Sequence, residues 1–515
     1  MHQVATSNKT GTPPSSNLCL STCELTCPPG TSPHTASIHI LDDDSLLNLF
    51  HLYRPAIFDG DEDDNVHIYG GMAWERERWW YKLAQVCQRW RNLIFGSASH
   101  LGLCLVCTRG TPVADMLAHS PPLPLIIDYF YADLDTTADD EEGITLALEQ
   151  RDRVRRIRLQ VPLPNLQKLI MAIDEEYPAL EYLILAHSTE DKSTALTLPE
   201  TLQVPHLRHL MLRDFSLPIE SRLLTSAVGI VTLCLSVDYP STYFQPNILL
   251  QWISFMPQLE TLLVVFLFPV PNREVGRQLM HTPNTTPITL PNLRWFGFQG
   301  VSAYLEAIIR RIITPRLERL GVQLFKQLTF SIPHLLQFID TTENLRFDSA
   351  KFEFSGNEVY VRVYPPGETV TMHALSIYID CWHLDWQVSS VTQIFSTRSE
   401  IFSTVEHLIF EHEAHGRSSE EHNEVDRIEW RKLLRSFSNV KSLRVGDGLV
   451  KELSCCLRPD DGEHPLELLP ELQDLTYSGS GDTGNAFTPF IDARQNTSHP
   501  VTLVRSSPRP VTALS

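Results

Sequence analysis

The chain has 515 residues, of which 43% are hydrophobic, and its 42 Lys and Arg residues are outnumbered by 62 Asp and Glu residues. The net charge of −20 argues against nucleic acid or an anionic membrane surface as a partner, because both are bound through basic faces. The best apolar run, residues 259–269, is about half of the ~20 residues that a membrane-spanning helix needs.

The first segment, residues 1–36, is rich in Pro, Ser and Thr and almost free of periodic apolar positions, so we expect a disordered tail. It lacks the continuous apolar stretch of a signal peptide. We therefore expect an intracellular protein, cytoplasmic or nuclear, whose cysteines lie in a reducing compartment. Those within apolar segments should pack as small hydrophobes; they are Cys87, Cys104, Cys107, Cys234 and Cys381.

Two helical patterns follow the tail. The first lies behind an expected Asp cap at Asp43 or Asp44 and has apolar residues at Leu41, Leu46, Leu47, Phe50 and Leu52. Residues 59–64 are acidic and contain Gly, which predicts a loop. Residues 74–95 then predict one amphipathic helix that ends at Gly96. Its apolar face comprises Trp79, Leu83, Val86, Trp90, Leu93 and Ile94.

The rest of the chain repeats one pattern, in which apolar residues stand at a first position, three residues later and five residues later. Successive first positions are 23 to 35 residues apart. The clear copies are Val154/Ile157/Leu159, Leu180/Leu183/Leu185, Leu207/Leu210/Leu212, Ile230/Leu233/Leu235, Leu259/Leu262/Val264, Leu293/Phe296/Phe298, Leu317/Leu320/Val322, Met372/Leu375/Ile377, Val405/Leu408/Phe410, Val440/Leu443/Val445 and Leu472/Leu475/Tyr477. A degenerate copy is Ser349/Phe352/Phe354.

This spacing is the L-x-x-L-x-L core of leucine-rich repeats. In each copy the three apolar side chains should point into a shared interior, while the residues at +1, +2 and +4 stay on or near the surface. Helical patterns at residues 247–255, 303–313 and 428–437 would return the chain along the outer face. We predict an α/β fold: an irregular leucine-rich-repeat solenoid of parallel strands and outer helices, preceded by a small all-α module.

The predicted domains follow from these patterns. They are a tail at residues 1–36, the helical module at 37–100 with an acidic insertion at 53–78, the solenoid at 101–505 and a flexible tail at 506–515.

Several motifs resemble catalytic or metal sites, but none has the context that the chemistry needs. Residues 479–484 fit G-x-G-x-x-G, yet the following strand lacks a ribose-binding acid and too little chain follows to complete a dinucleotide fold. His412 and His415 are one residue too close for the helical zinc motif. The acidic run from Asp59 to Asn65 lacks the Gly and the Glu that a calcium loop requires.

The remaining candidates are cysteines. Cys19, Cys23 and Cys27 are spaced by four residues in the tail, and Cys104 and Cys107 form a single C-x-x-C motif without a second pair. Zinc shared between the two groups stays an open alternative, but the strand-like context of residues 101–107 favours buried thiols. No P-loop motif occurs. We therefore expect neither an enzyme nor a bound cofactor or metal.

Two features carry a resemblance to a known family. Leu83, Val86, Cys87, Trp90 and Arg91 match the Leu-x-x-Val-Cys-x-x-Trp-Arg signature at the end of an F-box, and the apolar residues from Leu41 to Leu52 resemble its opening helix. With the irregular repeats, and with residues 110–128, the chain is similar over residues 37–505 to F-box-like proteins with degenerate leucine-rich repeats of mushroom-forming fungi (basidiomycetes).

The resemblance implies a substrate receptor of a cullin–RING (SCF-type) ubiquitin ligase. Its F-box-like helices would dock a Skp-family adaptor, and through it a cullin, and its repeats would hold a target protein. The implied adaptor-binding residues are Leu41, Leu46, Leu47, Phe50, Leu52, Leu83, Val86, Cys87, Trp90 and Leu93.

The sequence departs from the family pattern at Leu41-Asp42, where Leu-Pro is usual, and by the long insertion at residues 53–78. An alternative therefore stays open. In it, the chain is an interaction scaffold whose helical module has lost adaptor binding, and its apolar residues pack the module onto the first repeat.

Overall fold

The computed structural model describes residues 41–55, 77–130, 136–187, 196–218, 220–226, 228–268, 287–325, 330–366, 373–397, 399–412, 427–459, 467–478, 485–495, 497 and 499–506. The predictions for residues 1–36, for the acidic stretch at 59–64 and for the Gly motif at 479–484 lie outside these residues. So does the predicted C-terminal tail at 506–515, except for Ser506, which ends β20.

The centre of the fold is one curved sheet, in which the described residues form sixteen strands. Its spatial order is β1 (Leu105–Cys107), β2 (Leu125–Phe130), β3 (Val154–Val161), β4 (Tyr182–His187), β6 (His209–Arg213), β8 (Thr232–Val237), β9 (Thr261–Phe266), β11 (Trp295–Gly300), β13 (Arg319–Leu324), β16 (Leu375–Asp380), β15 (Glu358–Tyr364), β14 (Ser349–Phe354), β17 (His407–His412), β18 (Ser442–Val445), β19 (Asp474–Ser478) and β20 (Thr502–Ser506). All neighbouring strands are parallel except where β15 pairs with β14 and β16.

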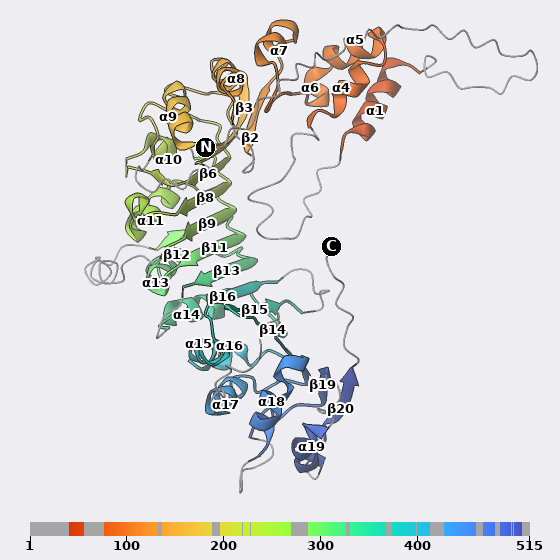
Figure 1. Cartoon of the computed structure of the whole chain (residues 1–515), viewed down its shortest axis with the longest axis vertical. Coiled ribbons are helices and arrows are strands. Elements are labelled where there is room, and N and C mark those ends of the chain that lie inside the picture. Colours follow the sequence, from red (N-terminus) through yellow and green to blue (C-terminus); the bar gives the residue numbers. More distant parts are fainter. Residues whose placement is uncertain are drawn as a thin grey trace, which may run out of the picture.

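Helices follow the strands along the outer, convex side of the sheet (Figure 1). They are α7 (Val113–His119), α8 (Ala138–Leu148), α9 (Leu163–Ala172), α10 (Arg222–Ser226), α11 (Pro246–Ser254), α13 (Ser302–Ile309), α14 (Pro333–Thr341), α15 (Leu384–Ser396), α16 (Ser399–Phe402), α17 (Arg427–Arg435), α18 (Val450–Leu457) and α19 (Thr488–Gln495). Short 3₁₀ turns lie at Pro240–Thr242 and Asp447–Leu449, and the pairs β5 (Leu196–Thr197) with β7 (Phe215–Ser216) and β10 (Ile288–Thr289) with β12 (Ile312–Ile313) form two small sheets.

In the described residues before the first strand, four further helices occur: α1 (Asp43–Tyr53), α4 (Trp79–Ala84), α5 (Gln88–Gly96) and α6 (Ala98–Leu101). We call them the helical module, and Figure 1 shows them at one end of the curved sheet. Among the described residues, no helix combines the length and the apolar character that crossing a bilayer requires.

The repeated pattern forms the core, as predicted. Met372 lies outside the described residues, and every other member of the eleven clear copies is at most 3% exposed. Equivalent residues also pair directly across the sheet, as Leu183 does with Leu210 and Leu233 with Leu262. Because no single repeat can cover its own apolar side, these rows bury it against the neighbouring repeats. The result is a mixed α/β fold whose large parallel sheet agrees with the predicted leucine-rich-repeat solenoid.

The degenerate copy was placed in the wrong register. Ala350 pairs with Leu408 and Phe352 with Phe410, so the copy is Phe347/Ala350/Phe352 and starts two residues earlier than predicted. Its neighbour β15 was not predicted. Val359, Val361 and Val363 alternate with polar residues there and are fully buried, which is the period-2 pattern that could have revealed this strand.

The predicted helices at residues 247–255 and 428–437 correspond to α11 and α17. The helix predicted at residues 303–313 ends early, since α13 stops at Ile309 and residues 312–313 form β12.

In the helical module, the prediction of a single helix over residues 74–95 is wrong. The described part forms α4 and α5, separated at Cys87, whose extended backbone interrupts the helix, although α5 does end at Gly96. The cap of α1 is Asp42, not Asp43 or Asp44, and it accepts a hydrogen bond from the Ser45 amide at 2.7 Å.

Candidate functional site

The ten residues assigned to adaptor binding meet in the helical module but differ in burial. Leu46 and Phe50 are buried, and the ring of Phe50 meets Trp90 edge-on with centroids 4.9 Å apart. Arg89 ties α5 to the start of α1 by donating to the Leu41 carbonyl oxygen and to Asp43, both at 2.7 Å. Half-buried positions are Leu41, Leu47, Leu83, Cys87, Trp90 and Leu93. Leu52 is 82% exposed and Val86 is 58% exposed.

Helix α1 carries more exposed apolar surface than the sequence analysis assigned. Leu49 and Tyr53 are exposed as well as Leu52, and we call these three residues the α1 apolar strip. At 3.6 residues per turn, the strip continues the buried stripe of Leu46 and Phe50 around one side of the helix. The spacing of Leu49 and Tyr53, four residues apart, was the signal in the sequence that could have identified them.

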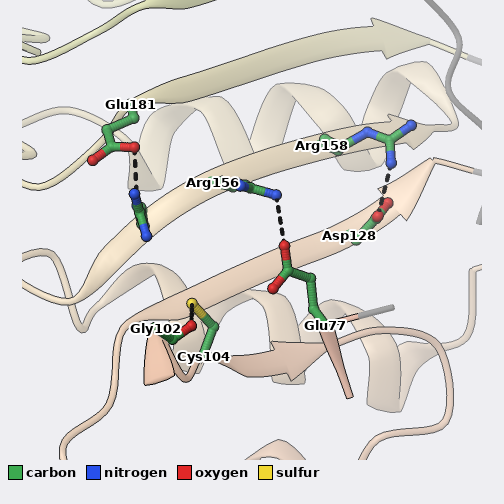
Figure 2. A network of polar contacts seen from close by, with 8 residues as sticks. Glu77, Gly102, Cys104, Asp128, Arg156, Arg158 and Glu181 are labelled. Carbon is green, nitrogen blue, oxygen red and sulfur yellow. Dashed lines mark hydrogen bonds and ion pairs between the residues drawn. The ribbon is translucent and has the colours of Figure 1, made fainter. Parts of the chain in front are cut away.

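Polar contacts fix the helical module on the first strands of the sheet. The Trp80 indole donates to the Cys104 carbonyl oxygen at 3.3 Å. Glu77 pairs with Arg156 of β3 at 3.1 Å, as Figure 2 shows. Beside this pair, Arg158 and Asp128 form a buried ion pair at 2.9 Å (Figure 2). Burial raises the pKa of Asp128, and the charge of Arg158 offsets this only in part. The contacts of Trp80 and Glu77 thus connect the helical module to the first strands, whereas the Arg158–Asp128 pair connects β3 to β2.

Strands β2, β4, β6 and β8 also carry apolar side chains on the face opposite to the repeat core. A second cluster consists of Phe130, Ile184, Ala186, Met211 and Cys234, each less than 9% exposed. Ile184, Met211 and Cys234 occupy the +4 position of successive copies, where surface residues were predicted, so that prediction is wrong for these repeats. Their own apolar character was the available signal. This row gives the inner face of the sheet an apolar centre.

At the carboxyl ends of β4, β6 and β8, acidic and basic side chains link successive repeats. His187 lies 3.3 Å from Asp214, which also accepts a hydrogen bond from the Asp238 amide at 2.5 Å. Burial raises the pKa of Asp238 although Arg213 donates to it at 2.7 Å. Asp214 has a left-handed backbone with φ of +63°. Because the Asp214 carboxylate accepts a hydrogen bond from the backbone of the next repeat, we assign this cluster a structural role.

Aromatic residues mark the later repeats. Trp382 and Trp386, 63% and 45% exposed, follow the carboxyl end of β16. Tyr360 and Tyr378 lie on neighbouring strands β15 and β16, with ring centroids 4.6 Å apart. Exposed Trp side chains are enriched at the energetic centres of protein interfaces. This part of the sheet is therefore a candidate contact for a protein partner.

The described residues include no group of three or more His, Cys, Asp or Glu side chains placed to hold a metal ion. Cys104 and Cys107 are buried, and burial raises the pKa of Cys107 to about 12. Cys19, Cys23, Cys27 and His415 lie outside the described residues.

No protein-family model matches the sequence, and no curated protein matches it. Among solved structures, the chain is similar to the leucine-rich repeat-containing protein LegL7 from Legionella pneumophila. The match covers 76% of this chain and 97% of that protein, at 11% identity and a TM-score of 0.24. The description of the fold therefore rests on the strand order and register given above.

Proposed function

We propose that the chain is a non-catalytic substrate receptor of a cullin–RING (SCF-type) ubiquitin ligase, of the F-box-like kind found in mushroom-forming fungi. In this proposal the helical module docks a Skp-family adaptor, which connects it to a cullin, and the repeats hold the protein to be ubiquitylated. The observation that carries the proposal is the exposed apolar surface of α1 and Val86, on the module whose residues 83–91 match the F-box signature. Exposed apolar side chains gathered on one helix favour a protein partner.

Burial divides the proposed site residues into two roles. Leu46 and Phe50 hold the module together, so they would support docking without touching the adaptor. Leu52 and Val86, with the rest of the α1 apolar strip, would make the contacts, each contributing about 1–3 kcal/mol to binding where the adaptor buries it fully.

The test is direct binding of a purified Skp-family adaptor to the full chain by calorimetry. We expect Leu52→Asp and Val86→Asp each to weaken binding at least about tenfold, because a charge would be buried in an apolar interface. Met171→Asp is the matched control, since Met171 is 69% exposed on α9, away from the module. Failure of the wild-type chain to bind the adaptor, or equal binding by all variants, would contradict the proposal.

The scaffold alternative has its own support. Trp80 donates to the Cys104 carbonyl oxygen, Arg78 donates to the Val106 carbonyl oxygen, and Glu77 accepts from Arg156. Such hydrogen bonds are those expected of a module that covers the end of the sheet. The same calorimetry separates the two functions, because a scaffold would leave the adaptor unbound. Substitutions of Phe50 and Trp90 are poor tests, since their packed rings also hold the module together.

A further inference from the structure

Strands β15 and β16 carry two tyrosines and two carboxylates on the inner face of the sheet. Buried core residues alternate with Glu358 and Tyr360 on β15 and with Tyr378 and Asp380 on β16. The antiparallel register places Tyr360 opposite Tyr378 and Glu358 opposite Asp380. Because opposed residues have Cβ atoms about 5 Å apart, the four side chains form one group.

Contacts within the group support this reading of the register. The rings of Tyr360 and Tyr378 meet edge-on with centroids 4.6 Å apart, and the Tyr378 hydroxyl donates to the Glu358 carboxylate. Burial raises the pKa of Tyr378, as do its hydrogen bond to Glu358 and the charge of Asp380. Trp382 follows Asp380 by two residues and is 63% exposed. We call Glu358, Tyr360, Tyr378, Asp380 and Trp382 the aromatic–acidic patch.

The patch carries two negative charges, and within the described chain no Lys or Arg forms an ion pair with either carboxylate. The basic side chains of the neighbouring inner face pair with other acids. Lys351 pairs with Glu353 at 2.5 Å and with Glu411 at 2.9 Å. Arg362 also pairs with Glu353. Like charges directly opposite each other on two strands repel, so a cation from a partner would offset the repulsion within the patch.

The aromatic rings favour an organic cation. The guanidinium carbon of Arg362 lies 5.1 Å from the ring centre of Tyr360, so the chain itself already places a cation against one ring of the patch. Faces of Tyr and Trp rings attract guanidinium and ammonium groups. A metal ion is less well matched, since among the described residues no three His, Cys, Asp or Glu side chains are grouped to hold one. A Lys or Arg side chain therefore suits both the charges and the rings.

The backbone of the patch is fixed from the other side of the sheet. Gln387 of α15 is fully buried, and its side-chain amide donates to the carbonyl oxygens of Ser355 at 2.8 Å and Cys381 at 2.7 Å. Ser355 starts the turn that joins β14 to β15. Cys381 stands between Asp380 and Trp382. A site that is ordered before binding loses less conformational entropy when its partner binds.

We propose that the aromatic–acidic patch binds a basic segment of a partner protein, one Arg or Lys side chain of which pairs with Glu358 and Asp380 beside the aromatic rings. The net charge of −20 would attract such a partner over a longer range. The proposal deepens the proposed function by giving the class of protein that the repeats hold. Only the role of that partner as a ubiquitylation substrate rests on the proposed function, because the patch needs no adaptor to bind.

The experiment is fluorescence anisotropy of a labelled peptide, made of three Gly-Arg-Ser repeats, titrated with the full chain without adaptor. Salt at about 0.15 M limits attraction by distant charges, since the screening length is then about 8 Å. We expect saturable binding, and none for the same peptide with Glu in place of Arg. Asp380→Asn and Glu358→Gln should each weaken binding about tenfold, because each removes one charged partner of the cation. Trp382→Ala should weaken it about threefold.

Asp474→Asn is the matched control. It makes the same substitution on the inner face of β19, where the neighbours in register, Ser442 and Thr502, are uncharged. The affinity should stay unchanged. The proposal is overturned if the Arg peptide shows no saturable binding up to about 1 mM, or if the Glu peptide binds equally well. It is also overturned if Asp380→Asn, with a wild-type circular dichroism spectrum, binds as tightly as wild type or no more weakly than Asp474→Asn. Since the assay contains no adaptor, its failure leaves adaptor docking standing, and failure of adaptor docking leaves its result standing.

Discussion

At the residue scale, burial separates the cysteines into two chemical classes. Cys107, Cys234 and Cys456 are at most 3% exposed, and loss of hydration of the charged form raises the pKa of each thiol to about 12. Cys455, the neighbour of Cys456 in α18, is exposed. Because only the thiolate reacts with alkylating reagents, adjacent residues of one helix should differ sharply in reactivity.

We predict that iodoacetamide at about pH 8 modifies Cys455 and leaves Cys456 unmodified, since a pKa near 12 leaves only about one thiol in ten thousand ionised. Tandem mass spectrometry of the peptide that contains both residues measures this directly, and the denatured chain, in which both should react, is the control. Equal modification of the two cysteines in the native chain would show that α18 does not pack as described.

The raised pKa values of the same thiols predict that the folded chain becomes less stable at alkaline pH. The folded-state pKa of the Cys234 thiol is raised to about 12, whereas the pKa of an unfolded thiol is near 8.5. Between these two values the unfolded chain loses its thiol proton and the folded chain keeps it, so the contribution of the buried thiol to stability is complete below about pH 8.5 and is lost as the pH rises toward 12. The free energy of unfolding should therefore fall through that window, by at most about 1.4 kcal/mol per pH unit for each thiol. Cys234→Val should flatten the fall, because it removes one titrating group from the second apolar cluster.

The core rows could be predicted from the sequence because they depend on local spacing alone. Residues such as Leu183 and Leu262 stand at fixed offsets within a copy, and any parallel stacking of such copies buries them. The +4 residues Met211 and Cys234 could not be placed in this way, because the repeat pattern leaves that position to the surface. Their burial follows from the apolar character of their neighbours in the row, such as Ile184.

At the element scale, the break between α4 and α5 shows what apolar periodicity leaves undetermined. Trp79, Leu83, Val86 and Trp90 fit one helix, but in the structure Val86 points to solvent and Cys87 has an extended backbone with φ of −158°. Cys87 is the N-cap of α5, and its sulfur accepts a hydrogen bond from the Trp90 amide at 3.5 Å. A sulfur is a weak acceptor, so this cap is weak.

We predict that Cys87→Ser strengthens α5 by about 0.5–1 kcal/mol, because Ser is among the best N-cap residues. Hydrogen exchange should show slower exchange of the Trp90 amide. Cys455→Ser is the control, since it makes the same substitution at an exposed position within α18 and should leave α5 unchanged. Unchanged or faster exchange at Trp90 in Cys87→Ser would contradict the assigned cap.

The register of β14 illustrates a second limit of sequence. A shift of two residues leaves the same side chains on each face of a strand, so Ser349/Phe352/Phe354 and Phe347/Ala350/Phe352 predict the same alternation. Pairing with Leu408 and Phe410 of β17 decides between them. On its other side β14 pairs with β15, which stands between β14 and β16, an arrangement that the spacing of the repeats does not encode.

At the scale of the whole molecule, the sheet is continuous, and each of its described strands is hydrogen-bonded only to the strands beside it (Figure 1). In such an array, stability is approximately a sum of local terms, so damage to one repeat should spread over a limited distance. The antiparallel strand β15 stands where the strand order departs from chain order, between the earlier repeats that end at β13 and the later ones that start at β17.

We predict that Phe352→Ala and Phe298→Ala destabilise different parts of the chain. Phe352 of β14 packs against Phe395, Phe410 and Phe437 with ring centroids 5.0–5.8 Å apart, whereas Phe298 of β11 packs against Phe266 and Tyr304. Both side chains are buried, so each truncation should cost about 3–5 kcal/mol locally. Hydrogen exchange should speed up in β14, β17 and β18 for the first variant and in β9, β11 and β13 for the second. Each variant is the control for the other, because both remove the same buried side chain and should lose a similar free energy of unfolding. Uniform loss of protection across all described strands in either variant would show that the sheet unfolds as one cooperative unit.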